Sequence, residues 1–160
     1  WAIPGTPGLE HRIGGLEKQH ITGNVSYDPE NHEFMVRMRQ AKIDGIAEDL
    51  PPAVVEGDQK GELLVVGWGG TYGAIRTAVE SRRAAGKSVS HLHLMYLNPF
   101  QKNTGEILYN FKQILVPELN LGQLSKILRS KFLVPAVSLN KIQGLPFRAA
   151  EIEKKIDELL

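Results

Sequence analysis

From Val54 to the C-terminus, short apolar runs alternate with segments in which apolar residues recur at helical spacing. Of all the features of the sequence, this alternation restricts the possible folds most. The run from Leu63 to Val66 has no polar residue, which is typical of a strand covered on both faces. A glycine-rich turn follows it, and then a helix is predicted over about 71–85, ending at Gly86. Strands that alternate with helices through short connections predict a mostly parallel sheet between two helical layers, an α/β/α fold.

The other predicted elements continue the pattern. Further strands are expected at Val54 to Glu56, Val89 to Leu97, Ile114 to Val116 and Leu133 to Val137. Further helices are expected at about 104–112, at about 121–131 and from near Pro146.

Residues 1–28 are rich in glycine and polar residues and show no period of 2 or 3.6. They predict an extended arm, either mobile or docked on a neighbouring molecule. Asp28-Pro29 is a good helix start, and Pro51-Pro52 ends the predicted helix after about Glu48.

The domain boundaries follow from this division. We expect an arm plus a helix over residues 1–50 and an α/β domain over 51–160. Because the chain begins at Trp1 within a loop-like segment, we also expect it to be a piece of a longer protein that lacks a preceding domain.

Composition excludes several classes of function. The formal net charge is +1, so nucleic-acid binding is disfavoured. The sequence contains no cysteine, which excludes disulfides, a thiol nucleophile and cysteine-ligated clusters on this chain. No apolar run approaches the roughly 18 to 20 residues of a membrane span, and no secretion signal is visible. We therefore expect a cytoplasmic protein without a membrane partner.

The turn Gly67–Gly73 invites comparison with a dinucleotide-binding loop. That loop needs the spacing G-x-G-x-x-G, and Tyr72 occupies the position of the third glycine. The next predicted strand is followed by Asn98, where such sites carry an acid for the ribose. A tight turn that lets the helix pack on the strand is one interpretation, and a nucleotide or anion site at the helix start is the alternative.

Histidines occur in two settings. His91 and His93 share one face of a predicted strand, but no third ligand is evident, so we expect no metal site. Hydrogen-bonded histidines beneath a helix are the favoured interpretation. His11 lies among glycines in the arm, where it could contact a neighbour.

The ends of the predicted parallel strands form the best candidate site, since function collects at such carboxyl ends. The candidate rim residues are Gly69, Gly70, Asn98, Glu118, Asn120, Gln123 and Asn140. Glu118 could act as an acid or base, or it could cap the next helix together with Asn120. No complete catalytic constellation is present, so we assign no catalytic, cofactor-binding or metal residue.

Several motifs together resemble one known family. They are GTPGLEHRIGGLEK, VSYDPENHE, VVGWGGTYGAI, YLNPF, VPELNLGQL and LNKIQGLPF. In this order they resemble the alpha subunit of 2-oxoacid:ferredoxin oxidoreductases, and most closely the 2-oxoglutarate type, in which gamma and alpha regions are fused.

The resemblance implies a fold like the transketolase C-terminal domain, with five strands of which the first is antiparallel. It implies a packing and subunit-assembly domain beside beta and gamma parts, in a complex that forms acyl-CoA and reduces ferredoxin. Thiamine diphosphate, magnesium and iron–sulfur clusters are expected elsewhere in that complex, with no cofactor on this chain. The corresponding domain of a transketolase or of a branched-chain dehydrogenase beta chain is the second alternative.

Overall fold

A computed structural model describes residues 2–11 and 14–160 of the chain, so Trp1, Arg12 and Ile13 lie outside the described residues. The chain divides into two compact units, one that ends at Asp44 and one that spans Gly45–Leu160. Each unit has its own internal arrangement.

The first unit is built around helix α1 (Pro29–Gly45). Asp28 Oδ1 accepts hydrogen bonds from the backbone N–H groups of Glu30 (2.8 Å) and Asn31 (3.3 Å), which confirms the predicted helix start. Ahead of the helix, Lys18 and Val25 form an isolated antiparallel bridge. The Asn31 side chain binds this turn, since Nδ2 donates to the Lys18 carbonyl at 3.1 Å and Oδ1 accepts from His20 N at 2.9 Å.

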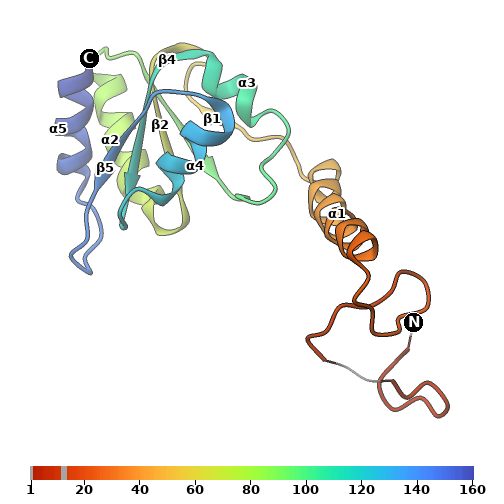
Figure 1. The fold of residues 1–160 in the computed structure, drawn as a ribbon. Coiled ribbons are helices and arrows are strands. Elements are labelled where there is room, and N and C mark those ends of the chain that lie inside the picture. The colour runs from red at the N-terminus through yellow and green to blue at the C-terminus, as the bar shows by residue number, and fades with distance from the viewer. Residues whose placement is uncertain (1, 12–13) are drawn as a thin grey trace. The chain divides into compact units, whose positions relative to one another are not determined.

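The second unit is a five-stranded sheet with helices on both faces (Figure 1). A short 3₁₀ helix, Ile46–Glu48, leads into it. The strands are β1 (Val55–Glu56), β2 (Gly61–Trp68), β3 (Val89–Leu94), β4 (Phe111–Glu118) and β5 (Ala136–Asn140). The helices are a 3₁₀ turn (Gly69–Thr71), α2 (Tyr72–Ala84), α3 (Thr104–Tyr109), α4 (Gln123–Phe132) and α5 (Ala149–Leu159).

The strand order is β1-β3-β2-β4-β5, and only β1 runs antiparallel to its neighbour. The expected five-stranded, mostly parallel α/β sheet is therefore confirmed. Because β2 to β5 are parallel, they all end on one side of the sheet, here called the carboxyl edge.

Two apolar cores lie on opposite faces of the sheet. Leu64 and Val66 of β2 pack with residues of α3 and α4, whereas Leu63 and Val65 pack with residues of α2 and α5. The central strand β2 is thus buried on both faces, as its uninterrupted apolar sequence predicts. Figure 1 shows α2 and α5 together on one side of the sheet and α3 and α4 on the other.

Three predicted boundaries are wrong, each because a neighbouring element decides where a strand begins or ends. β3 stops at Leu94, because its partner β2 stops at the paired Trp68, so Asn98 lies four residues beyond the strand and not at its end. Phe111 belongs to β4 and not to a helix, since it pairs with Gly61. Leu133 adopts a left-handed conformation (φ 54°) that ends α4, so β5 begins only at Ala136.

Within residues 2–11 and 14–160, none of the helices combines the length and the apolar character that crossing a membrane requires.

Candidate functional site

Glu118 is the centre of the carboxyl edge, and its side chain is fully buried. Its Oε1 accepts hydrogen bonds from Leu124 N (2.7 Å), Asn120 Nδ2 (3.2 Å) and Trp68 Nε1 (3.4 Å). Its Oε2 accepts from Ser125 N at 3.1 Å. The carboxylate therefore caps the start of α4 and is saturated with donors, which favours a structural role over proton transfer.

Asn120 fixes the turn between β4 and α4. Its Oδ1 accepts hydrogen bonds from Gly122 N at 2.8 Å and from Gln123 N at 2.9 Å, while its Nδ2 donates to Glu118. Gln123 begins α4 with an exposed side chain. The hypothesis that Glu118 and Asn120 hold the loop that presents Gln123 matches these contacts.

Asn140 belongs to the same group, because its backbone pairs in register with Glu118 across the β4–β5 ladder. Ser138 Oγ donates to Asn140 Oδ1 at 2.5 Å, and Ser125 Oγ lies 3.3 Å from Ser138 Oγ. A short polar chain therefore connects the start of α4 with the end of β5.

The glycine turn after β2 lies against the β4–α4 turn. Trp68, Gly69, Gly70, Thr71, Leu119 and Asn120 line a hollow of about 210 Å³, here called the carboxyl-edge hollow. The Thr71 hydroxyl donates to the Trp68 carbonyl at 2.8 Å and accepts from Trp68 N at 3.2 Å, which closes the turn. The lining has no charged side chain, so nothing in it specifically favours a nucleotide phosphate or another anion.

Two candidate residues do not join this group. Asn98 is exposed in the loop after β3, and the described residues contain no hydrogen-bond partner for its side chain. His11 is exposed as well, and its Nδ1 lies 2.9 Å from the Leu9 carbonyl in its own turn. A role for His11 in contacting a neighbour stays a prediction.

The histidines of β3 lie beneath the start of α2. The His91 ring lies 5.8 Å from the His93 ring, and the Tyr72 ring lies within 5.5 Å of both. His91 Nδ1 lies 3.3 Å from Glu56 Oε2. Burial lowers the pKa of both histidines, and the Glu56 carboxylate offsets that effect only in part. Among residues 2–11 and 14–160, no three His, Cys, Asp or Glu side chains are arranged to hold a metal ion.

Sequence reasoning assigned no role to two residues that complete the site. Trp68 connects the glycine turn to Glu118, and Ser125 connects Glu118 to the end of β5. The signals were present, since a tryptophan is unusual in a glycine turn and a serine in the first turn of a helix often forms local hydrogen bonds.

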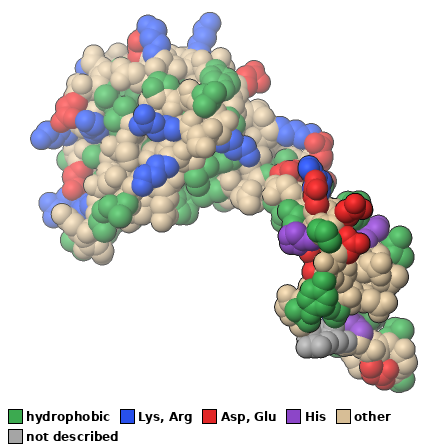
Figure 2. All heavy atoms as spheres, in the orientation of Figure 1, with side chains coloured by type: hydrophobic (Ala, Val, Ile, Leu, Met, Phe, Trp, Pro, Cys, Tyr) green, Lys and Arg blue, Asp and Glu red, His purple; other side chains and the backbone are tan. Residues whose placement is uncertain are grey.

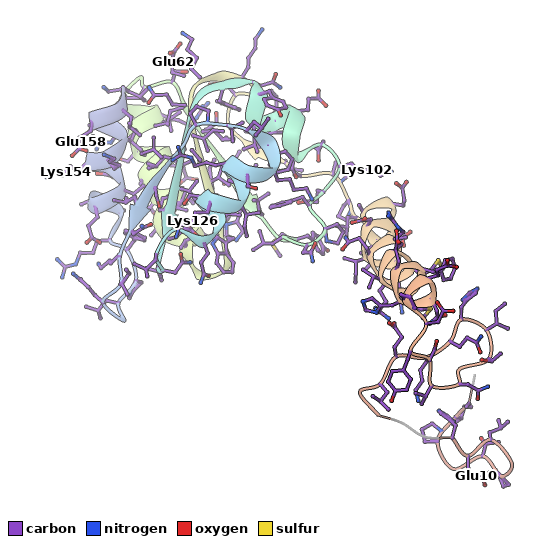
Figure 3. All side chains as sticks on the ribbon, in the orientation of Figure 1. Glu10, Glu62, Lys102, Lys126, Lys154 and Glu158 are labelled. Atoms are coloured by element: carbon purple, nitrogen blue, oxygen red, sulfur yellow. The ribbon has the colours of Figure 1, made fainter. Side chains whose placement is uncertain are left out.

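The carboxyl edge also exposes large apolar side chains in the loops after three successive strands. They are Met95 and Tyr96 after β3, Leu119 and Leu121 after β4, and Ile142 and Leu145 after β5. Figure 2 shows hydrophobic side chains between single Lys and Arg residues on the visible face of the second unit. Glu62, at the amino end of β2, marks the opposite side of the unit in Figure 3.

The chain is similar to known proteins over nearly its whole length. It is 53% identical over 157 residues to the 2-oxoglutarate oxidoreductase subunit KorA of Mycobacterium tuberculosis, covering 98% of this chain. It is 30% identical over 154 residues to the alpha subunit of 2-oxoacid:ferredoxin oxidoreductase 2 of Aeropyrum pernix. The chain spans 24% of the length of each of these relatives. No model of a known protein family matches the chain.

A comparison with solved structures finds the same family of enzymes. The 2-oxoglutarate:ferredoxin oxidoreductase of Magnetococcus marinus, solved with 2-oxoglutarate, coenzyme A and succinyl-CoA, matches 98% of this chain with a TM-score of 0.88 and 31% identity. The matched part is 28% of that chain. A split-gene transketolase matches 69% of this chain, and 42% of its own, with a TM-score of 0.54 and 15% identity, which shows a shared fold only.

Proposed function

The chain belongs to the alpha subunits of the 2-oxoacid:ferredoxin oxidoreductases, of which it spans about a quarter, and from this we propose that it is their packing and subunit-assembly domain. Its complex would oxidatively decarboxylate a 2-oxoacid, most specifically 2-oxoglutarate, to acyl-CoA and pass the electrons to ferredoxin. The beta and gamma parts of the enzyme would be the partners of this domain.

The observation that carries the proposal is the apolar rim of the carboxyl edge. Leu121 is 69% exposed and Met95 is 73% exposed, although both follow strands that are otherwise buried. Exposed apolar side chains that gather on one side of a fold are typical of a surface that a protein partner covers. The loop that carries Leu121 is held by Glu118 and Asn120, so the surface is already ordered before a partner binds.

The residues of the carboxyl-edge hollow do not fit a diphosphate or its magnesium ion, and the sequence does not fit an iron–sulfur cluster. The carboxyl-edge hollow has no cation for a diphosphate and no free carboxylate for magnesium, because the Glu118 oxygens already accept four hydrogen bonds. The sequence has no cysteine to hold an iron–sulfur cluster. The reaction would therefore depend on other parts of the enzyme, and we expect the chain alone to show no turnover of 2-oxoglutarate with viologen as the electron acceptor.

The assembly proposal is tested in the full-length alpha subunit with Leu121→Asp. An aspartate at the centre of an apolar interface should weaken association with the beta subunit by about tenfold or more, measured by sedimentation or calorimetry. Leu133→Asp is the matched control, because Leu133 is 85% exposed but lies before β5, away from the carboxyl edge. Equal affinity of both variants and the unsubstituted subunit would show that the rim is not an interface.

A further inference from the structure

A second concave surface lies apart from the carboxyl-edge hollow and shares Met95 and Tyr96 with the apolar rim of the carboxyl edge. It is a groove of about 570 Å³ between the segment that leads into β1 and the end of β3, here called the β1–β3 groove. Its apolar walls come from Pro51, Pro52, Ala53, Val54, Met95 and Tyr96, and its polar groups from Glu56, Tyr72, His93 and Gln101. This volume and this mixture of groups are typical of binding sites.

One wall of the groove is rigid without any occupant. Asn103 binds the Ala53 backbone on both sides, since Oδ1 accepts from Ala53 N and Nδ2 donates to the Ala53 carbonyl, each at 2.8 Å. Gln101 Nε2 donates to the Pro51 carbonyl at 2.7 Å. Val54, directly beside these fixed residues, is nevertheless 71% exposed. Binding here would cost little ordering of the protein.

Among the described residues, Glu56 is the single charged side chain that lines the groove. The Tyr72 hydroxyl donates to its Oε1 at 2.8 Å, and His91 Nδ1 lies 3.3 Å from its Oε2. Burial alone would raise the pKa of Glu56, but Tyr72 and His91 hold it below its ordinary value. The carboxylate is therefore ionised at neutral pH and fixed in orientation.

The nearest cations leave that charge available. Arg76 reaches the Tyr72 hydroxyl at 3.3 Å and helps to lower the pKa of Glu56, but its guanidinium is paired with Glu80 at 2.8 Å. Lys102, labelled in Figure 3 and next in sequence to the groove residue Gln101, is paired with Glu48. Both histidines are neutral at pH 7, because burial lowers their pKa values. The groove consequently carries a net negative charge.

Two further features of the groove suit a cation that is carried on a polypeptide segment. Tyr96 provides an aromatic ring, which attracts a cation placed over its face, whereas the Tyr72 ring already has Arg76 over it at 6.0 Å. His93 Nδ1 is buried, with no hydrogen-bond partner within the described chain, so the ring proton is better placed on Nε2. Nε2–H could then donate to a carbonyl of a bound segment.

We propose that the β1–β3 groove binds an arginine or lysine side chain on an apolar segment of a partner polypeptide. The cation would lie against Glu56 and the Tyr96 ring, and its stem and apolar neighbours would lie against Val54, Met95 and the prolines. This deepens the assembly role and rests on it for the identity of the partner, but the binding chemistry follows from the groove alone.

The test uses the 160-residue chain and two peptides that differ in one charge, acetyl-Leu-Arg-Leu-amide and the same peptide with citrulline for arginine. Calorimetry or shifts of the histidine and tyrosine NMR signals should show saturable binding of the arginine peptide. Binding of the citrulline peptide should be weaker by about tenfold, about 1.4 kcal/mol. Because both peptides meet the same protein, this comparison does not depend on how a variant folds.

The variant Glu56→Gln should weaken binding of the arginine peptide by a similar factor. The matched control Glu62→Gln, a half-exposed glutamate on the opposite side of the unit, should leave binding unchanged. Equal binding of both peptides, or no saturable binding at millimolar concentration, would overturn the proposal. So would ethylguanidinium binding as tightly as the peptide, which would indicate a small-cation site, or Glu56-dependent self-association, which would indicate a second copy. None of these results depends on the Leu121 experiment, so the two proposals can fail separately.

Discussion

At the scale of single residues, the carboxyl edge depends on one buried charge. The Glu118 carboxylate is removed from water, but two backbone N–H groups at the start of α4, the Asn120 amide and the Trp68 indole replace its hydration. A buried carboxylate is tolerable only with such a full set of donors. Substitution of Glu118 should therefore lower the stability of the fold.

Glu118→Gln keeps the size of the side chain but replaces one acceptor oxygen with an NH₂ donor. We expect the free energy of unfolding to fall by about 2 kcal/mol, since hydrogen bonds to charged groups are strong and the α4 donors would lose a partner. Asn120→Ala should cost about 1 kcal/mol, because it removes only the turn contacts. Urea denaturation measures both, with the half-exposed, ion-paired Glu62→Gln as a control expected to change little. Equal stability of Glu118→Gln and the control would contradict the role given to Glu118.

The histidines of β3 predict a dependence of stability on pH. Burial lowers the pKa values of His91 and His93 in the folded chain, whereas in the unfolded chain both histidines have the ordinary pKa of about 6.5. Just below pH 6.5 the unfolded chain therefore binds protons that the folded chain does not. Stability should be level above pH 6.5 and should fall as the pH drops below 6.5 toward the folded-state pKa values. Urea midpoints between pH 7.5 and pH 5 would measure this fall. The double variant His91→Gln with His93→Gln should reduce it, whereas the exposed His11→Gln should not.

At the scale of elements, Gly67 sets the distance between β2 and α2. A Cβ at this position would lie 2.4 Å from Ile75 Cδ1 and 3.0 Å from Thr71 Oγ1. Ile75 is fully buried, so its methyl group has little room to move away. Glycine at position 67, one residue before the end of β2, is therefore a packing requirement.

Gly67→Ala should destabilise the second unit by about 1–3 kcal/mol through this overpacking. Gly70→Ala, in the 3₁₀ turn that follows β2, is the matched control, because no atom lies within 4 Å of its added Cβ. Thermal unfolding followed by circular dichroism distinguishes the two variants. An equal effect of both would mean that the turn, and not the contact with Ile75, limits stability.

Sequence patterns predicted the elements of this fold better than their ends. The apolar run identified β2, because a strand that is buried on both faces contains almost no polar residues. The alternation of strands and helices identified the three layers. The end of β3 could not be predicted, since Met95-Tyr96-Leu97 has good strand character but no partner strand beyond Trp68. The sequence predicted only some of the contacts in the candidate site. Glu118 and Asn120 could be assigned to it because they lie at and just after the end of a predicted strand. The contact between Trp68 and Glu118 could not be predicted, because it requires knowing that β2 lies beside β4.

At the scale of the whole molecule, the two units differ in how much they bury. Among residues 2–11 and 14–44 none is buried, and α1 leaves Phe34, Val36 and Met38 largely exposed. A helix without a covered face gains little from packing. The first unit therefore gains the least stability from its own packing.

Hydrogen exchange should report that difference directly. In the 160-residue chain by itself, the amides of α1 should exchange fast compared with those of β2 and β4. In the assembled enzyme, α1 should gain protection if a partner covers its apolar side chains. Strong protection of α1 in the chain alone, at a concentration where it is monomeric, would contradict this expectation.

The position of β2 at the middle of the sheet has a consequence for how the chain acquires its structure. β2 precedes both of its neighbours in sequence, and β4 becomes available only after α2, β3 and α3 have been synthesised. Until then one edge of the strand that contains Leu63 to Val66 has unpaired backbone N–H and C=O groups. The nascent chain therefore has an exposed apolar strand edge that can pair with other chains. Productive folding on the ribosome must therefore wait for β4, and a pause in translation before Phe111 would prolong the period in which the chain can misassociate.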